Sequence, residues 1–113
     1  MLLALALVAR GALAAGFLAD PDRTRLGANE TLTLRLIAEG RLKGEPDLSP
    51  LEKDFEILSR STSSRTTIVN GDMSQSREWV LELAPRRTGD LVIPILTLGG
   101  ERSQAVAIQV VPA

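Results

Sequence analysis

The sequence predicts an all-β protein, an antiparallel immunoglobulin-like β-sandwich of about seven strands. Asn70-Gly71 lies between two runs of strand-forming residues, which is the strongest hairpin signal in the chain. Residues 31–36 alternate polar and apolar side chains with the period of a strand that has one buried face. Turn residues recur at short intervals, and 113 residues suffice for one domain.

Residues 1–15 predict a signal peptide. An apolar run at 2–9 is followed by Ala12-Leu13-Ala14, which matches the small-residue cleavage pattern. No basic residue precedes the run and Arg10 interrupts the segment, so a short N-terminal helix of a cytosolic protein is the alternative. The run is too short to cross a membrane. We therefore expect a signal peptide at 1–15 and one sandwich domain at 16–113.

The first strands follow in order from this boundary. We expect a strand at 16–19, a turn at 20–22, and a strand at 31–36 whose three leucines point inward. Residues 40–54 contain two prolines and seven charged side chains, which predicts a surface connection with a short turn at 49–52.

The central hairpin has two possible registers. A two-residue turn would place Trp79 opposite Thr62. A three-residue turn with a bulge at Gly71 would place Leu83 opposite Ile57. We prefer the three-residue turn because a slip of one residue flips every side chain, and this register gives one coherent apolar face. That face comprises Phe55, Ile57, Trp79, Leu81 and Leu83.

Three further strands complete the prediction. A turn at 86–90 precedes a strand at 91–93, which Pro94 interrupts. The strand resumes at 95–98, and after a glycine turn the last strand covers 105–111.

The composition excludes several kinds of chemistry. The chain has no His and no Cys, so a Ser-His-Asp or Cys-His centre, a zinc knuckle and a disulfide are all impossible. Its 13 basic and 14 acidic residues are interspersed, without the basic patch typical of nucleic-acid binding. We expect no enzyme activity and no cofactor.

Two carboxylate pairs and one set of oxygen ligands for calcium are the candidates for chemistry. Asp20 with Asp22, and Glu52 with Asp54, lie in polar loops, and we interpret them as solvated charges. Calcium prefers six to eight oxygen ligands, and the set formed by Asp20, Asp22, Asn29 and Glu30 lacks a regularly spaced acidic run. We therefore assign no catalytic, cofactor-binding or metal-binding residue.

Residues 59–67 are rich in Ser and Thr. We interpret them as the solvated face of a strand, which could bend near 59–64 and pass between sheets. The alternative is an exposed edge strand that pairs with another chain, with Arg60 and Arg65 limiting self-pairing. Similarly, Arg86 and Arg87 are expected to solvate a turn, and docking of an acidic partner is the alternative.

An ordered set of short motifs resembles the N-terminal domain of the BatD family, the bacterial oxygen tolerance or aerotolerance proteins. The resemblance covers about residues 16 to 111. Its pieces, in order, are Asp22-Arg23-Thr24-Arg25, Asn29-Glu30-Thr31-Leu32, Pro46-Asp47-Leu48-Ser49, Asp54-Phe55-Glu56-Ile57, Val69-Asn70-Gly71, Glu78-Trp79, Arg87-Thr88-Gly89, Ile93-Pro94 and Gly99-Gly100.

The resemblance implies an exported protein on the periplasmic side of the cytoplasmic membrane. Full-length members have tandem β-sandwich domains and a membrane anchor, so we expect this chain to be part of a longer protein. The implied role is non-catalytic protein–protein interaction, together with MoxR-type ATPases and von Willebrand factor A domain proteins. The alternative is a module that binds sugar or calcium. Trp79 is expected in the core and not as a sugar platform.

Overall fold

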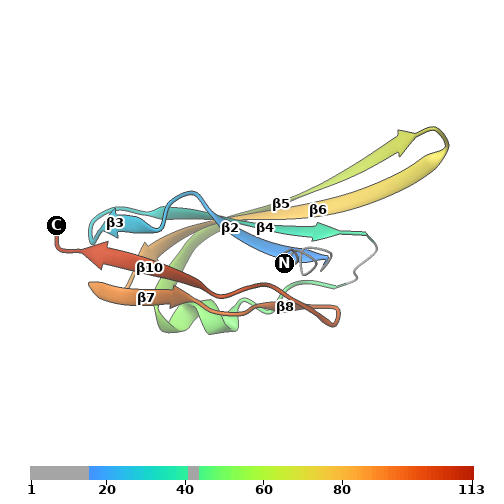
Figure 1. Ribbon diagram of the computed structural model, residues 1–113. Helices are drawn as coiled ribbons and strands as arrows, with labels where there is room; N and C mark the ends of the chain where they lie inside the picture. The colour runs from blue at the N-terminus through green and yellow to red at the C-terminus, as the bar shows by residue number, and fades with distance from the viewer. Residues whose placement is uncertain (1–15, 41–43) are drawn as a thin grey trace, which may run out of the picture.

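The computed structural model describes residues 16–40 and 44–113, which form two facing β-sheets and a small hairpin (Figure 1). The first sheet has the strand order β2-β4-β6-β5, the second has the order β3-β10-β7, and β8 pairs with β9. The strands are β2 (Phe17–Pro21), β3 (Arg25–Gly27), β4 (Leu32–Glu39), β5 (Phe55–Val69), β6 (Asp72–Pro85), β7 (Gly89–Ile93), β8 (Thr97–Leu98), β9 (Glu101–Arg102) and β10 (Val106–Val111).

The predicted all-β sandwich is confirmed, with nine strands in the described part of the chain instead of about seven. The two additional strands are β3 and β9, which have three and two residues and were not predicted from the sequence. β3 forms because the chain leaves the first sheet after β2 and joins the second, where it pairs parallel with β10. Strands this short show no periodicity in the sequence.

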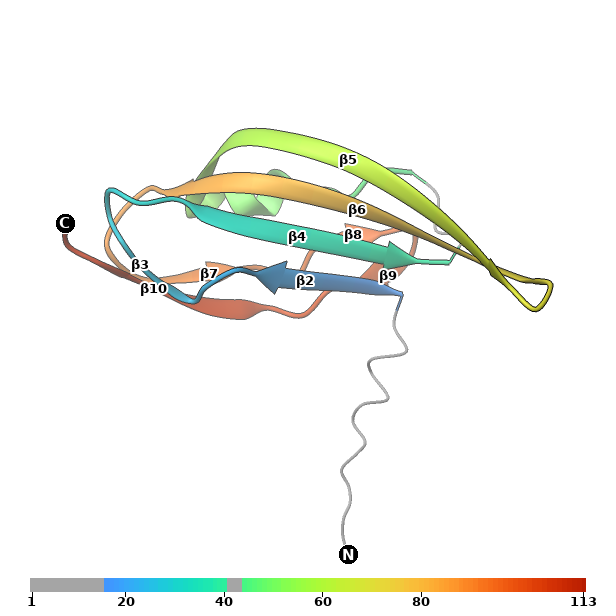
Figure 2. The ribbon, with the colours of Figure 1, turned by 90° about the horizontal axis from the view of Figure 1, so that it is seen from above.

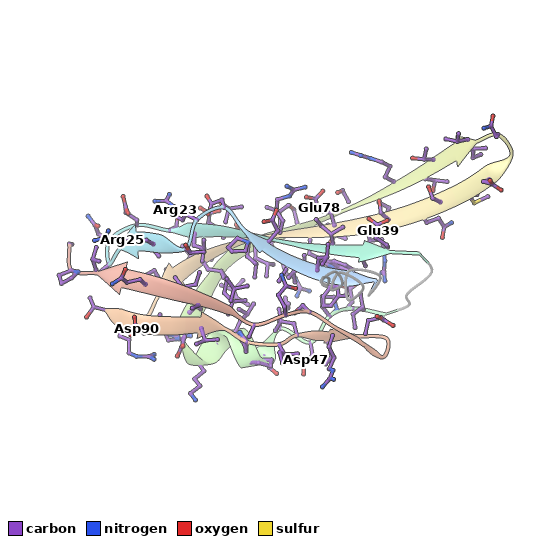
Figure 3. The ribbon with its side chains drawn as sticks, viewed as in Figure 1. Arg23, Arg25, Glu39, Asp47, Glu78 and Asp90 are labelled. Atoms are coloured by element: carbon purple, nitrogen blue, oxygen red, sulfur yellow. The ribbon has the colours of Figure 1, made fainter. Side chains whose placement is uncertain are left out.

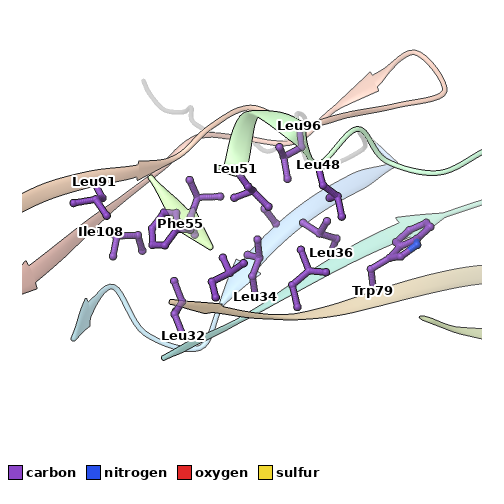
Figure 4. Close-up of a cluster of buried hydrophobic side chains, with 14 of the residues drawn as sticks. Leu32, Leu34, Leu36, Leu48, Leu51, Phe55, Trp79, Leu91, Leu96 and Ile108 are labelled. Atoms are coloured by element: carbon purple, nitrogen blue, oxygen red, sulfur yellow. The ribbon is translucent and has the colours of Figure 1, made fainter. Parts of the chain in front are cut away.

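The core lies between the two sheets (Figure 4). The three leucines of β4 are fully buried, as their alternation predicts, and alternate residues of β6 face the same way. On the second sheet, alternate residues of β7 and β10 are buried and form the opposite wall of the core. The fully buried side chains with the largest volumes are Trp79, Phe17, Phe55, Leu32, Leu34, Leu36, Leu51, Leu81, Leu83, Leu91, Ile93 and Leu96.

The connection before β5 is more than a surface loop. It contains a 3-10 helix, η2 (Ser49–Lys53), in which a proline occupies the first turn. Leu48 and Leu51 are both buried and close the core on this side (Figure 4). The expectation of a purely exposed connection is therefore wrong, because the sheets leave an open side that apolar residues of this segment fill.

The central hairpin combines both registers that the sequence left open. Near the turn the register is that of a two-residue turn, and Thr62 lies opposite Trp79. Asn70 and Gly71 have φ angles of 54° and 84°, as a type I′ turn requires. The preferred three-residue turn is therefore wrong, because Asn-Gly adopts the left-handed conformation at both positions without an extra residue.

The bulge exists, but it lies at Leu58, far from the turn. Beyond it Ile57 lies opposite Leu83, as the three-residue turn also predicted. The apolar face is confirmed, because Phe55 and the three β6 residues are buried and Ile57 packs partly buried against them. β5 stays paired with β6 along its whole length and does not pass to the second sheet.

Leu51 and Leu58 allow a matched test of this packing. We expect Leu51→Ala to lower the free energy of unfolding by about 2–5 kcal/mol, because it opens a cavity in the core. Leu58→Ala makes the same change at a bulge residue that is 50% exposed, and should cost far less. Urea denaturation measures both values, and equal costs would contradict the role assigned to η2.

Candidate functional site: a projecting hairpin arm

The hairpin of β5 and β6 extends well beyond the sandwich (Figure 1). β4 pairs with β6 only as far as Glu39 opposite Ser76. Residues 65–76, which we call the arm, therefore pair almost entirely with each other. No second sheet covers either face of the arm, and its side chains point into solvent on both sides (Figure 3).

Three large apolar side chains are exposed at the tip of the arm. Ile68, Val69 and Met73 are 66%, 58% and 56% exposed. Ile68 lies opposite Met73, so their side chains share one face of the arm. This face continues the one that buries Trp79 nearer the core. The apolar pattern of the sandwich thus runs on into a region that has no core.

β5 is also the outermost strand of its sheet (Figure 2). Every residue from Leu58 to Val69 on β5 is exposed. The segment at 59–67 is thus a solvated strand face, which was the preferred prediction. It also lies on an exposed sheet edge, which was part of the alternative prediction. The sequence could not separate the two because the strand order depends on distant parts of the chain.

A shallow hollow lies on the outer face of the sheet where the arm begins. It encloses about 260 Å³ and is lined mainly by polar and charged side chains of β4, β5 and β6, including Glu39 and Arg65. Arg35 donates to Glu78 in this hollow and lies 3.8 Å from Asp20. The hydrogen bond to Glu78 raises the pKa of Arg35 above its ordinary value. These opposite charges neutralise one another across neighbouring strands.

Trp79 is a core residue, as expected, and is fully buried. Its Nε1 donates to a carboxylate oxygen of Glu45 at 3.2 Å, and the Arg77 guanidinium lies 4.9 Å from the ring centroid. Phe17 meets the ring edge-on at 6.4 Å between centroids. No face of the indole is left for stacking on a sugar.

The four residues considered for calcium are not assembled into a site. Arg23 forms ion pairs with both Asp22 and Glu30, at 4.0 and 3.4 Å, so these two carboxylates already have a cationic partner. Asp20 lies instead beside Arg35, and Asn29 is near Gly27. Within residues 16–40 and 44–113, no three acidic side chains are grouped so as to hold a metal ion.

Asp54 is buried, at 8% exposure, so its interpretation as a solvated charge is wrong. Its carboxylate accepts hydrogen bonds from Arg87 Nη1 at 2.7 Å and from the Val92 N–H at 3.1 Å. The hydrogen bond from Arg87 is the largest cause that lowers the pKa of Asp54 below its ordinary value of 3.8. Asp54 thereby links the end of η2 to β7 and to the turn that precedes it.

Arg86 and Arg87 serve the same connection. Arg86 Nε donates to the backbone oxygen of Glu52 at 2.8 Å, and the Arg86 N–H donates to that of Asp54 at 2.9 Å. Glu52 itself stays exposed, as expected. Both arginines therefore bind their own chain, so turn solvation describes only part of their role.

The described residues define an immunoglobulin-like β-sandwich domain with a projecting arm. The family model described as "BatD DUF11 like domain" matches residues 19–110, which is most of the chain. The chain belongs to the BatD family of aerotolerance-related envelope proteins, as the motif resemblance implied. Neither a search of curated proteins nor a search of solved structures found a match.

The structure describes no membrane-spanning helix and does not describe the predicted signal peptide. Among the described residues, no helix is long and apolar enough to span a bilayer. The predicted signal peptide at 1–15 lies outside the described residues, and its cleavage stays a prediction.

The buried carboxylate of Asp54 predicts a dependence of stability on pH. Because its pKa is lowered by folding, it stabilises the fold above about pH 4, and this contribution is lost as pH falls further. We expect Asp54→Asn to lower the free energy of unfolding at pH 7 by about 1–3 kcal/mol. The difference from the native chain should shrink as the pH falls below about 4.

Asp90→Asn is the matched control, because Asp90 is exposed on β7. It should change the free energy of unfolding little at any of these pH values. Urea denaturation at each pH measures all three proteins. A difference between native chain and Asp54→Asn that does not change with pH would contradict the assigned role.

Proposed function

We propose that this domain is a non-catalytic interaction module of the cell envelope, and that the arm is its contact element. The observation that carries the proposal is the exposed apolar tip of the arm, whose residues are not part of the buried core. Membership of the BatD family supports the envelope location, and export to the periplasmic side is part of the proposal. Von Willebrand factor A domain proteins and MoxR-type ATPases are the proposed associates.

The energetics of the arm support a role in contact. An isolated two-stranded hairpin is at best marginally stable in water, so the arm is a costly addition to a sandwich that does not need it. Exposed apolar side chains gain about 25 cal/mol for each Å² that a partner covers. Burial of Ile68, Val69 and Met73 in a complex is therefore favourable, whereas in the isolated domain more than half of the surface of each is exposed.

We base the proposed absence of enzymatic activity on the amino-acid composition. The chain lacks the side chains that most often act as general base and as thiol nucleophile. The carboxylate with the deepest burial, Asp54, is held by Arg87 and by a backbone N–H, and serves the fold.

A photo-crosslinking amino acid placed at Met73 tests this proposal in living cells that make the protein. We expect covalent adducts with envelope proteins, identified by mass spectrometry, because Met73 lies at the contact element. The same amino acid at Val92, which is 44% exposed on the other sheet, is the matched control and should give few adducts. Equal labelling from both positions, or adducts with cytosolic proteins alone, would refute the proposal.

A further inference from the structure

The backbone of β5 presents an open row of hydrogen-bonding groups. The Gly40 N–H donates to the Gln75 carbonyl oxygen at 2.8 Å, so the backbone groups of Gln75 point away from β5. Thr66 lies opposite Gln75, and in an antiparallel pair its own N–H and C=O must then point to the free edge. By the alternation of the ladder, the outward-pointing residues are Arg60, Thr62, Ser64, Thr66 and Ile68.

Apart from Arg60 and Arg65, this edge lacks the usual protection. Folded proteins blunt exposed edges with short strands, prolines, bulges or inward charges. The stretch at 59–69 has no proline, and its ladder with β6 is uninterrupted after the bulge at Leu58. The outer strands β2 and β7, by contrast, have five residues each. An edge this long and regular is suited to accept another strand.

The charges on the edge indicate what that strand carries. Residues 57–71 contain Arg60 and Arg65 but no acidic residue. Neither arginine forms an ion pair within the part of the chain that the structure describes. Glu78, which lines the same hollow as Arg65, is bound by Arg35.

The two arginines lie on opposite faces of the sheet. Arg60 is opposite Leu81 and shares its core-side face, whereas Arg65 is opposite Ser76 on the outer face. A strand added beside β5 would place residues five positions apart next to the two guanidinium groups. One acidic residue at each of these positions would complement both charges.

We propose that residues 60–68 of β5 accept an extended acidic segment of a partner protein as an added β-strand, with two acidic residues five positions apart. The inference rests on the proposed interaction function and names the partner's chemistry. A second copy of this chain fits poorly, because pairing β5 with β5 would gather four arginines and no acid from 57–71 along one seam.

A synthetic peptide of about ten residues, made of threonine and valine with two glutamates five residues apart, is the probe. The full 113-residue chain is titrated with it while amide hydrogen exchange is followed residue by residue. We expect the amides of Arg60, Thr62, Ser64, Thr66 and Ile68 to exchange fast in the free protein and to become protected together on binding. Absence of binding, or binding without this alternate protection, would overturn the inference.

Charge reversal tests the role of the arginines. Arg60→Glu with Arg65→Glu should weaken peptide binding by about tenfold or more, measured by fluorescence anisotropy. Arg102→Glu reverses a single charge at an exposed position on β9 and should leave binding unaltered, whereas Arg60→Glu or Arg65→Glu alone should weaken it. A peptide with lysines in place of the glutamates should bind least to the native chain. Equal binding of both peptides would refute the acidic specificity.

Ser64→Pro separates this inference from the proposed function. The Ser64 N–H points outward, so proline removes an edge donor without removing a bond to β6. The amide protection of β6 checks that the variant keeps its ladder. Loss of the Met73 adducts in this variant would support the edge as the docking site. Undiminished adducts would overturn the edge inference and leave the proposed function standing. The edge inference would also be overturned if the native chain formed concentration-dependent dimers through β5.

Discussion

The extra residue at Leu58 reconciles two demands on one pair of strands. The Asn-Gly turn fixes the register from the tip, whereas the packing of Phe55 and Ile57 against the core fixes it from the base. The two registers differ by one residue, and a slip of one residue would turn every side chain of a strand to the wrong face. The bulge absorbs this difference, so the same hairpin forms both a wall of the core and a free arm.

The sequence predicted the elements whose evidence is local. The alternation of β4, the apolar face around Trp79 and the turn at Asn70 each show in a few neighbouring residues. The register prediction failed between Leu58 and the Asn70-Gly71 turn because it assumed one register along the whole hairpin. Nothing in the neighbouring sequence marks Leu58 as the bulge. β3 is equally hidden, because its three residues gain their strand conformation only by pairing with β10.

The sequence showed which residues form the candidate site, but it did not show where in the fold they lie. Residues 59–67 already suggested either a solvated face or an edge, and only the position of β5 at the end of its sheet shows that they are both. The burial of Asp54 depends on Arg87 and Val92, which are 33 and 38 residues away in the chain. Interactions over such separations follow from the packed topology, which short sequence patterns do not encode.

The separation of arm and core has an evolutionary consequence. Side chains at 65–76 contact one another and solvent, so replacing them changes the folding free energy of the sandwich little. Recognition can therefore diverge at the arm while the core alternation stays under selection for stability. Here the two properties are assigned to different stretches of the same two strands.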